Sequence, residues 1–404
     1  MIVLMAWRNI WRNKARSIVI MLSVAIGLLA GISVLALYKG MMKSRVRTVI
    51  DSEVSHLQIH HPDFKKEFHP SYILPGANDL LKKVQSYQGV KMAVPRTIAQ
   101  GMLVTTTSSA GVQINGIVPA LEYGASHLKQ KMIAGEGFTG NKKNEIVVGQ
   151  KLANKMKLKT GSKLVLTFTD TSDNLVSSAF RVAGIYRSGN APLDELNVYV
   201  QIATLNELLL TGDSFHEIAI LLNNDEDLQL VQQEVTNANP SLLVESWKDI
   251  SPETELMVRT VDEYSYIIMI IILFALAFGI LNTMLMSVLE RTREIGMMMA
   301  LGTARLKIFL LILVETVFLT IAGTPFGLLA AYLITGYYQR KGLDLSGMGK
   351  DMMASFGFET TIYPSFPWEK LTIILILVVG TALLSCLLPA MKALRLQPVQ
   401  ALRR

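Results

Sequence analysis

The sequence predicts a membrane protein with four transmembrane α-helices per subunit and an extracytoplasmic α+β domain inserted between helices 1 and 2. Three observations lead to this fold class. Half of the 404 residues are hydrophobic and only 18% are charged, whereas roughly a quarter of the residues in soluble domains are charged. Four long runs carry almost no charge. One stretch of 223 residues, 41–263, has the charge content of an ordinary soluble domain.

The four uncharged runs predict membrane spans at 17–40, 264–289, 308–339 and 371–391. Each is long enough, because about 20 apolar residues cross the hydrocarbon core as a helix. Buried helices of soluble proteins rarely stay uncharged beyond about 18 residues. The first run is longer than the apolar core of a signal peptide, and no small-residue cleavage site follows it before Lys39. We therefore expect it to be retained as a helix.

The net charge of +7 predicts how these spans are oriented. The segments 1–16, 290–307 and 392–404 together hold a net charge of +10, whereas 41–263 holds 22 basic and 25 acidic residues. Short cytoplasmic loops are enriched in Lys and Arg. We therefore expect a multi-pass inner-membrane protein with both termini and the 290–307 loop in the cytoplasm. The 41–263 domain and the short loop 340–370 would then lie outside, and no nucleic-acid partner is needed to explain the charge.

The N-terminal arm, 1–16, predicts an interfacial helix. Trp7 and Trp11 are four residues apart, as are Arg8 and Arg12. On a helix each pair shares a face. The indoles would then lie at the headgroup level, beside guanidinium groups that reach the lipid phosphates.

The inserted domain predicts alternating strands and helices. The expected strands are Val54–His60, Gln113–Val118, Glu145–Val148, Lys163–Thr169, Phe180–Tyr186, Asn197–Gln201 and Glu217–Leu222. The expected helices are Asn78–Tyr87, Gly149–Met156, Ala203–Leu210 and Asp225–Thr236. Both ends of the domain lead into spans 1 and 2, so the strands that flank it must return close together. The chain has a single cysteine, so packing alone has to hold the domain.

The sequence holds no motif of a catalytic or metal site. No phosphate-binding loop, H-E-x-x-H, C-x-x-C or G-x-S-x-G pattern occurs, so we expect no catalytic residues and no cofactor bound by this chain. His56, His60 and His61 lie close together, but on a strand only two of them could converge. Two ligands are too few for a metal site, and we expect none.

Glu315 is the one acidic residue inside a predicted span. A carboxylate at membrane depth is costly. We expect it to be a structural polar anchor, paired with an arginine of the preceding loop, rather than a proton relay. Gly323, Pro325 and Gly327 in the same span predict a kink or a close contact between helices.

The loop 290–307 is the most informative stretch. Its first half is charged and its second half, Met297–Leu301, is apolar. This pattern predicts a short amphipathic helix that Gly302 ends and that offers Met and Leu side chains to a protein groove. A solvated connector would not explain exposed apolar residues, so we expect a cytoplasmic protein partner.

Several motifs in combination resemble a known family of permeases. W-R-N-x-x-R-N-K-x-R precedes span 1, E-R-T-R-E-I-G and A-L-G-T lie between spans 2 and 3, and P-A-M-K-A-L-R-L-Q-P-V-Q-A-L-R ends the sequence. With the large inserted domain, they resemble the FtsX-like, type VII ABC superfamily, which includes MacB-type and LolC/LolE permeases. The chain length and the H-L-Q-I-H-H-P stretch at 56–62 are most similar to LolC/LolE lipoprotein-releasing permeases.

The resemblance implies a dimer of permease subunits, homomeric or heteromeric, each paired with a separate cytoplasmic ATPase that binds ATP and Mg. It implies a mechanical mechanism, in which closure of the ATPases below moves the outer domains above. Nine residues would form the ATPase-coupling contacts: Glu290, Arg291, Arg293, Glu294, Gly296, Met299, Ala300, Leu301 and Gly302.

For the cargo, the resemblance to LolC/LolE implies release of lipoproteins from the membrane lipids to a periplasmic carrier. The lipid would pass between spans 1 and 2 of opposing subunits, where Gly27, Gly31 and Gly279 let helices approach or part. Lifting an acyl chain from the bilayer costs about 0.8 kcal/mol per CH₂, so this process needs an energy source. Two alternatives stay open: MacB-like efflux of small molecules or peptides, and FtsX-like signalling to an extracytoplasmic hydrolase or sensor.

Overall fold

The computed structural model describes residues 2–12, 14–140, 144–348, 353, 358 and 361–394. These residues belong to two compact units. The helical unit is drawn from Met1–Met42, Val258–Asp344 and Thr361–Arg404. The α/β unit is drawn from Lys43–Met257 and Leu345–Thr360.

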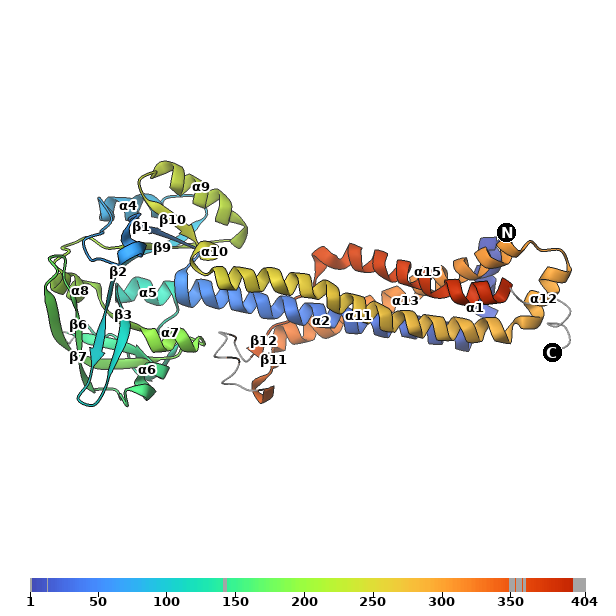
Figure 1. The fold of residues 1–404 in the computed structure, drawn as a ribbon, viewed down its shortest axis with the longest axis horizontal. Coiled ribbons are helices and arrows are strands. Elements are labelled where there is room, and N and C mark those ends of the chain that lie inside the picture. Colours follow the sequence, from blue (N-terminus) through green and yellow to red (C-terminus); the bar gives the residue numbers. More distant parts are fainter. Residues whose placement is uncertain are drawn as a thin grey trace. The chain divides into compact units, whose positions relative to one another are not determined.

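The helical unit is built from long helices (Figure 1). Its elements are α1 (Ile2–Arg12), α2 (Lys14–Val49), α11 (Pro252–Glu290), α12 (Thr292–Ala300), α13 (Arg305–Lys341), β11 (Leu343–Asp344), β12 (Thr361–Ile362), η4 (Trp368–Lys370) and α15 (Leu371–Leu394). Within the described residues, α2, α11, α13 and α15 are the four helices that are long and apolar enough to cross a membrane. Their number agrees with the four predicted spans.

Two of these helices run well beyond the predicted spans, and α2 and α11 also contribute residues to the α/β unit. α2 continues through Lys43, Arg45 and Arg47 to Val49. The spans were delimited by the first charged residue, which marks where apolar sequence stops. A helix does not need to stop there, because Lys, Arg and Glu have a high helix propensity in water. The helix can therefore continue outside the hydrocarbon core.

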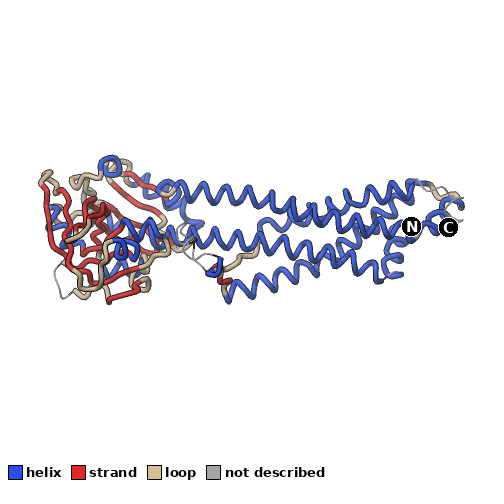
Figure 2. Tube along the Cα trace, turned by 60° about the horizontal axis from the view of Figure 1, so that its bottom comes forward, coloured by secondary structure: helices blue, strands red, loops and turns tan. Residues whose placement is uncertain are grey.

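The four long helices lie side by side and share one apolar core (Figure 2). Buried positions recur at helical spacing, so each helix turns one face inward; on α2 they include Ile20, Val24, Leu28 and Ile32. Gly323 and Gly327 of α13 pack directly on α2, since a Cβ added at Gly327 would lie 2.8 Å from the carbonyl oxygen of Ala25. The close helix contact predicted from these glycines is confirmed.

The α/β unit is built on one mixed sheet of ten strands. The strands are β1 (Leu57–His60), β2 (Val90–Val104), β3 (Ser109–Ile117), β4 (Met132–Gly135), β5 (Glu145–Gly149), β6 (Lys163–Thr169), β7 (Leu175–Tyr186), β8 (Asn197–Gln201), β9 (Glu217–Leu222) and β10 (Leu243–Ser246). The helical elements are η1 (Ile50–Val54), α3 (Phe64–Glu67), α4 (Ala77–Gln85), α5 (Pro119–Ala125), α6 (Gln150–Lys155), α7 (Ala191–Leu196), α8 (Ile202–Leu209), η2 (Asp225–Asp227), α9 (Leu228–Ala238), α10 (Trp247–Ile250) and η3 (Ser346–Met348).

Strand pairing divides this sheet into two lobes. Strands β2, β3, β8, β5, β7 and β6 pair in that order and close into a barrel, because β6 pairs with both β7 and β2. Helices α6 and α8 pack on the barrel core. Strands β10, β1 and β9 and the first half of β2 form an open sheet whose core includes α4 and α9. The long strand β2 is therefore shared by both lobes.

The fold confirms the α+β domain, and all seven predicted strands and four predicted helices occur. β1 and β10 pair directly, with Leu57 opposite Ser246, so the two ends of the domain do come together. The longest strand, β2, was not predicted, and neither were the short strands β4 and β10.

The reason β2 escaped prediction lies in two residues that usually interrupt strands, Pro95 and Gly101. Pro95 is tolerated because the pairing with β3 begins only at Arg96. Gly101 permits the close approach of β6, since a Cβ there would lie 2.5 Å from the carbonyl oxygen of Thr167. Both residues therefore allow β2 to pair with strands of both lobes.

Candidate coupling site

The loop predicted to contact a partner folds as the short helix α12, between α11 and α13. It follows Arg291 and ends in a Schellman motif. The N–H of Thr303 donates to the carbonyl of Met298 over 3.0 Å, and the N–H of Gly302 donates to the carbonyl of Met299 over 3.1 Å. Gly302 has a φ of +84°, which glycine adopts without strain. The predicted helix stop at Gly302 is confirmed.

α12 turns one face to the helical core and leaves the other exposed. The inner positions are Ile295 and Gly296, which are buried, and Met298 and Met299, which pack on the core. The outer apolar side chains are Met297, Leu301 and Leu306, which are 53%, 81% and 67% exposed. We call these three residues the coupling surface.

The nine predicted coupling residues divide by burial. The exposed ones are Glu290, Arg293, Glu294, Ala300, Leu301 and Gly302. Arg291 and Met299 are half-buried, and Gly296 is buried. Gly296 therefore packs α12 onto the helical unit and is not on the outer surface. Leu306 was not predicted, because it lies after the helix stop, in the first turn of α13.

A chain of alternating charges ties α12 to its neighbours. Arg291 Nη1 donates to Glu315 Oε2 over 3.1 Å, and Arg291 Nε donates to Glu294 Oε2 over 3.0 Å. Arg12 of α1 in turn donates to Glu294 Oε1. The expected pairing of Glu315 with an arginine of the preceding loop is confirmed by this contact. Its role as an anchor in the membrane stays a prediction.

Burial falls steadily along this chain. The side chains of Glu315 and Arg291 are 3% and 13% exposed, whereas those of Glu294 and Arg12 are 47% and 55% exposed. At Glu294, burial opposes the charge, but the hydrogen bonds from Arg12 and Arg291 outweigh it and lower the pKa of the carboxyl group. The outer pair is therefore ionised and accessible to salt, while the inner pair is shielded.

The N-terminal helix α1 forms as predicted and packs along α13. Ala6 and Ile10 are buried, and the ring centroids of Trp7 and Phe318 lie 6.0 Å apart. Trp11 stays 59% exposed. Sequence patterning found the amphipathic helix but not its contact with α12 through Arg12, because nothing local marks a partner 282 residues away.

The three glycines predicted to line a lipid path lie where α2 meets α11 in this chain. A Cβ added at Gly27 would lie 3.0 Å from the side chain of Leu276, whereas one added at Gly279 would first meet Ser23 at 3.8 Å. Gly31 is intermediate, with 3.4 Å to Ile272. These glycines allow close packing of α2 on α11; a passage for lipid stays a prediction.

The clustered histidines form contacts within the α/β unit. His56 lies 3.1 Å from Asp225 and His60 lies 3.0 Å from Glu217. Across the part of the chain that the structure describes, there is no group of three or more His, Cys, Asp or Glu side chains suited to a metal ion.

Two protein families match the chain. The MacB-like periplasmic core domain matches residues 17–238, and the FtsX-like permease C-terminal domain matches residues 266–398. The first match covers most of α2 and the α/β unit as far as the end of α9, and the second includes α12, α13 and α15.

Among the curated relatives, the macrolide export ATP-binding/permease protein MacB of Aggregatibacter actinomycetemcomitans is 25% identical over 334 residues, which cover 78% of this chain and 50% of the relative. MacB of Escherichia coli (strain K12) is 24% identical, over 99% of this chain and 60% of the relative. An uncharacterized ABC transporter permease of Methanocaldococcus jannaschii is 23% identical, over 100% of this chain and 97% of the relative. The chain thus spans about half the length of the first of these.

The similar solved structures include the periplasmic region of MacB from Actinobacillus actinomycetemcomitans. It is 13% identical, covers 52% of this chain and 97% of its own, and has a TM-score of 0.36. The extracellular domain of the noncanonic ABC-type transporter YknZ from Gram-positive bacteria covers 47% of this chain and 99% of its own, at a TM-score of 0.33.

Proposed function

The chain belongs to the MacB-like periplasmic core domain family, and from this premise we propose that it is the permease subunit of an ABC transporter. In this proposal a separate cytoplasmic ATPase, which binds ATP and Mg, docks on α12. Hydrolysis there changes the conformation of the α/β unit on the other side of the inner membrane. Two permease subunits act as a dimer.

The observation that carries the proposal is the coupling surface. Met297, Leu301 and Leu306 are large apolar side chains that face outward at a turn between two spans. Apolar side chains grouped in this way are typical of a protein contact rather than of a solvated loop. Methionine also adapts to the shape of a groove. An ATPase groove that receives α12 would bury all three.

The charge chain supports a mechanical role for α12. A push on α12 would reach α13 through Arg291 and Glu315, and α1 through Glu294 and Arg12. Because Arg291 and Glu315 are shielded from water, their ion pair resists separation more than an exposed pair does. Movement of α12 would therefore carry α13 with it.

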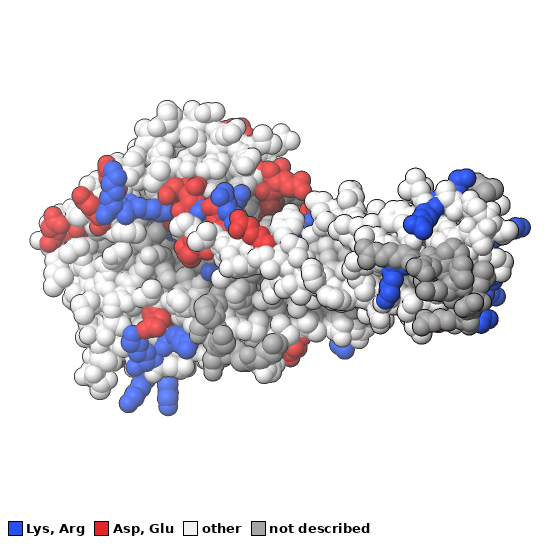
Figure 3. Space-filling model, turned by 45° about the vertical axis from the view of Figure 1, so that its right-hand side comes forward, with Lys and Arg blue, Asp and Glu red and all other residues white. Residues whose placement is uncertain are grey.

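The distribution of charge supports cytoplasmic termini. On the face drawn in Figure 3, Lys and Arg side chains gather at one end of the helical unit. In the sequence, basic residues at the ends of α1, α2, α12 and α13 include Arg12, Lys14, Arg291, Arg305 and Lys307. Basic residues near the ends of spans favour the cytoplasmic side.

Two cargoes are proposed. Release of lipoproteins to a periplasmic carrier is the first, and it rests on the similarity of the sequence to LolC/LolE permeases. Export of a small molecule or peptide is the second, and it is favoured by the name of the relatives in the comparison, which are macrolide exporters. Signalling to an extracytoplasmic hydrolase or sensor without transport remains the alternative from a different class.

The docking proposal is tested by Leu301→Asp in the full-length protein, co-expressed with its ATPase. A charge in the centre of an apolar contact should reduce co-purification of the ATPase by at least about tenfold. The matched control is Leu210→Asp, which places the same charge at a 64% exposed leucine of the α/β unit. ATPase association that is equal in the two variants would refute the docking assignment.

The cargo is tested by reconstitution with the active ATPase. A triacylated lipoprotein and a fluorescent macrolide are supplied in separate vesicles, and ATP-dependent transfer to a soluble acceptor or across the membrane is measured. Transfer of one and not the other selects the cargo. ATP hydrolysis without transfer of either would favour the signalling alternative.

A further inference from the structure

The α/β unit contains a cavity of about 270 Å³ that the coupling proposal does not use. It lies over one face of the sheet, where β1, β9, β2, β3 and β8 are neighbours. Each of these strands contributes polar side chains to the lining; the ones that matter here are Gln58, Glu217, Arg96, Asn115 and Asn197. Burying polar side chains on a sheet face is unfavourable unless they form hydrogen bonds, so this row of five polar side chains needs an explanation.

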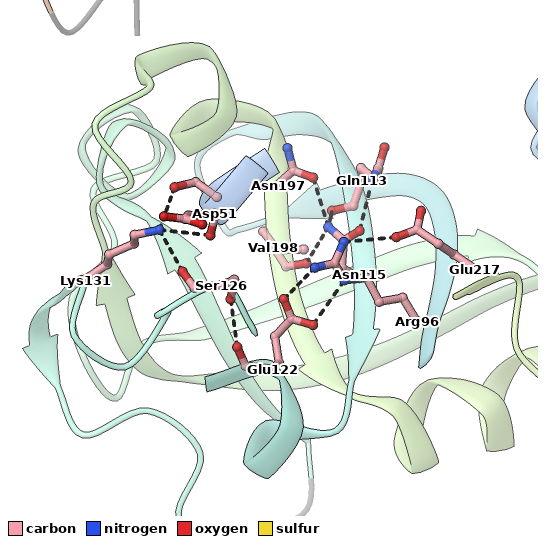
Figure 4. A network of polar contacts seen from close by, with 11 residues as sticks. Asp51, Arg96, Gln113, Asn115, Glu122, Ser126, Lys131, Asn197, Val198 and Glu217 are labelled. Carbon is pink, nitrogen blue, oxygen red and sulfur yellow. Dashed lines mark hydrogen bonds and ion pairs between the residues drawn. The ribbon is translucent and has the colours of Figure 1, made fainter. Parts of the chain in front are cut away.

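The charges under this cavity are already matched. Arg96 donates to Glu122 over 2.8 and 3.1 Å and to Glu217 over 3.0 Å (Figure 4). His60 lies 3.0 Å from Glu217. Lys65, also on the lining, is 2.6 Å from Glu245. A charged ligand would therefore find no unpaired counter-charge here, and its burial would carry a large penalty. The site favours a neutral ligand.

Gln58 is a polar side chain of the lining that has no hydrogen-bond partner among the described residues, and His60 Nδ1 on the same lining also lacks one. Gln58 lines the cavity and is only 5% exposed. Its carboxamide forms no hydrogen bond within the described parts of the chain, although a carboxamide offers two donors and an acceptor. The carboxamide is not one of the fully buried polar atoms without a partner, so it faces the open space of the cavity, where a ligand can form hydrogen bonds to it in place of water.

The opposite side of the floor is a chain of carboxamides. Gln113 Nε2 donates to Asn115 Oδ1, and Asn115 Nδ2 donates to Asn197 Oδ1, each over 2.9 Å (Figure 4). These bonds fix the orientation of the amide groups. A fixed amide can both donate to and accept from a hydroxyl group, because a hydroxyl also has both functions.

The walls of the cavity are partly aromatic. Phe64 stacks between His60 and His216, with ring centroids 5.7 and 4.8 Å apart, so its orientation is fixed. Phe68 lies beside it on the lining. Because both faces of Phe64 are covered, the half-buried ring of Phe68 is the one that a ligand can reach. An aromatic ring next to fixed amides suits a ligand that has an apolar face and a rim of hydroxyl groups.

We propose that this cavity binds a neutral saccharide unit. The unit is either a free sugar or the headgroup of a glycolipid, since both present the same hydroxyl groups. Its hydroxyls pair with Gln58 and with the carboxamide chain, and its C–H face packs on Phe68. The volume admits about one ring, because pockets for larger ligands begin at roughly 300 Å³.

A bound saccharide would touch the end of the first spanning helix. Ser52 and Val54 of η1 lie on the lining, and η1 directly follows α2. Lys131 holds this turn in place, donating to Asp51 O over 3.3 Å and to Ser52 Oγ over 2.5 Å (Figure 4). Occupancy of the cavity therefore stabilises the junction between α2 and the sheet.

The test uses the full-length protein in nanodiscs of phosphatidylcholine, because many detergents carry sugar headgroups. Saturation-transfer NMR titrations compare glucose and N-acetylglucosamine with glucuronic acid and with the dipeptide alanylalanine. A second set of nanodiscs contains a glucosyl lipid. The variants are Gln58→Leu and, as a matched control, Gln130→Leu, which changes an exposed glutamine of the same unit.

We expect saturable binding of a neutral sugar that Gln58→Leu weakens by at least about tenfold and Gln130→Leu leaves unchanged. Competition by the glucosyl lipid alone would support the site and identify the headgroup as the source. Gln58→Leu should not lower the unfolding temperature, because it removes a group without a partner, so loss of binding is separable from unfolding. Absence of sugar binding, binding that survives Gln58→Leu, or stronger binding of glucuronic acid or the dipeptide would each overturn the proposal.

Discussion

The two units each contain a network of alternating charges, and the networks differ in burial. In the α/β unit, Arg96 lies between Glu122 and Glu217, and all three side chains are at most 10% exposed. Burial opposes the charge of Arg96, but the two carboxylates outweigh it and raise the pKa of the guanidinium group above its usual value. This network lies where β2 passes from one lobe to the other.

In the helical unit, the chain from Glu315 through Arg291 and Glu294 to Arg12 runs from a buried side chain to an exposed one. Removing one partner of an ion pair that is shielded from water strongly destabilises a protein, because the other charge is left buried without a partner. An exposed pair contributes little and is screened by salt. The buried network therefore fixes a geometry, whereas the graded chain holds α12 firmly on its inner side and loosely on its outer side.

The largest expected effect is that of Arg96→Met, which leaves two buried carboxylates without their cation. The α/β unit should lose about 3–5 kcal/mol of its free energy of unfolding. Hydrogen exchange of the β2 and β9 amides in the full-length protein measures the loss locally. The control is Arg181→Met, an exposed arginine of the same unit, for which about 0.5 kcal/mol or less is expected. Equal losses of stability in both variants would show that the Arg96 network does not stabilise the α/β unit.

Acid should destabilise the α/β unit over two pH ranges. Burial lowers the pKa of His216 to about 4. The unfolded state takes up this proton first, so stability is lost as the pH falls from about 6.5 to about 4, at about 1.4 kcal/mol per pH unit. Burial opposes the charge of Glu217, but His60 and Arg96 outweigh it and lower its pKa to about 2. Its contribution is therefore lost between about pH 4.5 and 2.

Thermal unfolding of the full-length protein as a function of pH checks this expectation. His216→Gln should flatten the first of the two steps, because glutamine does not titrate. A profile that is flat from about pH 6.5 to 4 in the native protein would contradict the assignment to His216.

A smaller effect is expected for Arg291→Gln, which removes the charged hydrogen bonds to Glu315. The free energy of local unfolding should fall by about 1.5–3 kcal/mol. This loss would be seen as faster hydrogen exchange in α12 and the first turns of α13. Arg305→Gln, at an exposed arginine of the same segment, serves as the control. If α12 exchanged at the native rate in Arg291→Gln, the inner ion pair would not be what holds it.

The smallest effect belongs to the outer pair. Arg12→Gln should lower the free energy of local unfolding of α1 by about 0.2–1 kcal/mol. Raising the ionic strength to about 1 M, where the Debye length falls to about 3 Å, should have the same effect on the native protein. Hydrogen exchange of α1 at low and high salt measures both. The Arg96 network should not respond to salt; an equal response would remove the distinction between the two regions.

Much of the architecture could be predicted from local patterns, and the failures share one cause. Uncharged runs located four spans, and Gly302 marked the end of α12, because both signals act within a few residues. β2 was missed because Pro95 and Gly101 are explained only by strands far away in the sequence. Gly296 was assigned to the coupling contacts from the family resemblance, and spacing alone did not say that it is buried against the helical core; its part in coupling stays a prediction.

At the candidate site, one contact was predicted from the sequence and others were not. The sequence indicated that Glu315 pairs with an arginine of the preceding loop, since an isolated carboxylate in a span is too costly to leave alone. It did not indicate Arg12 or Leu306, and it gave no sign of the cavity beside Gln58, whose lining includes residues of nine separate helices and strands.

The sequence by itself determined the number of spans, the inserted domain and the short amphipathic helix, because hydrophobicity, charge and glycine act locally. Only the tertiary structure decided which charges meet. Arg96 needs Glu217 from a strand 121 residues away, and Arg12 needs Glu294 at 282 residues. Electrostatic and hydrogen-bond energies depend on distances in space, and the order of residues along the chain does not fix those distances until the chain has folded.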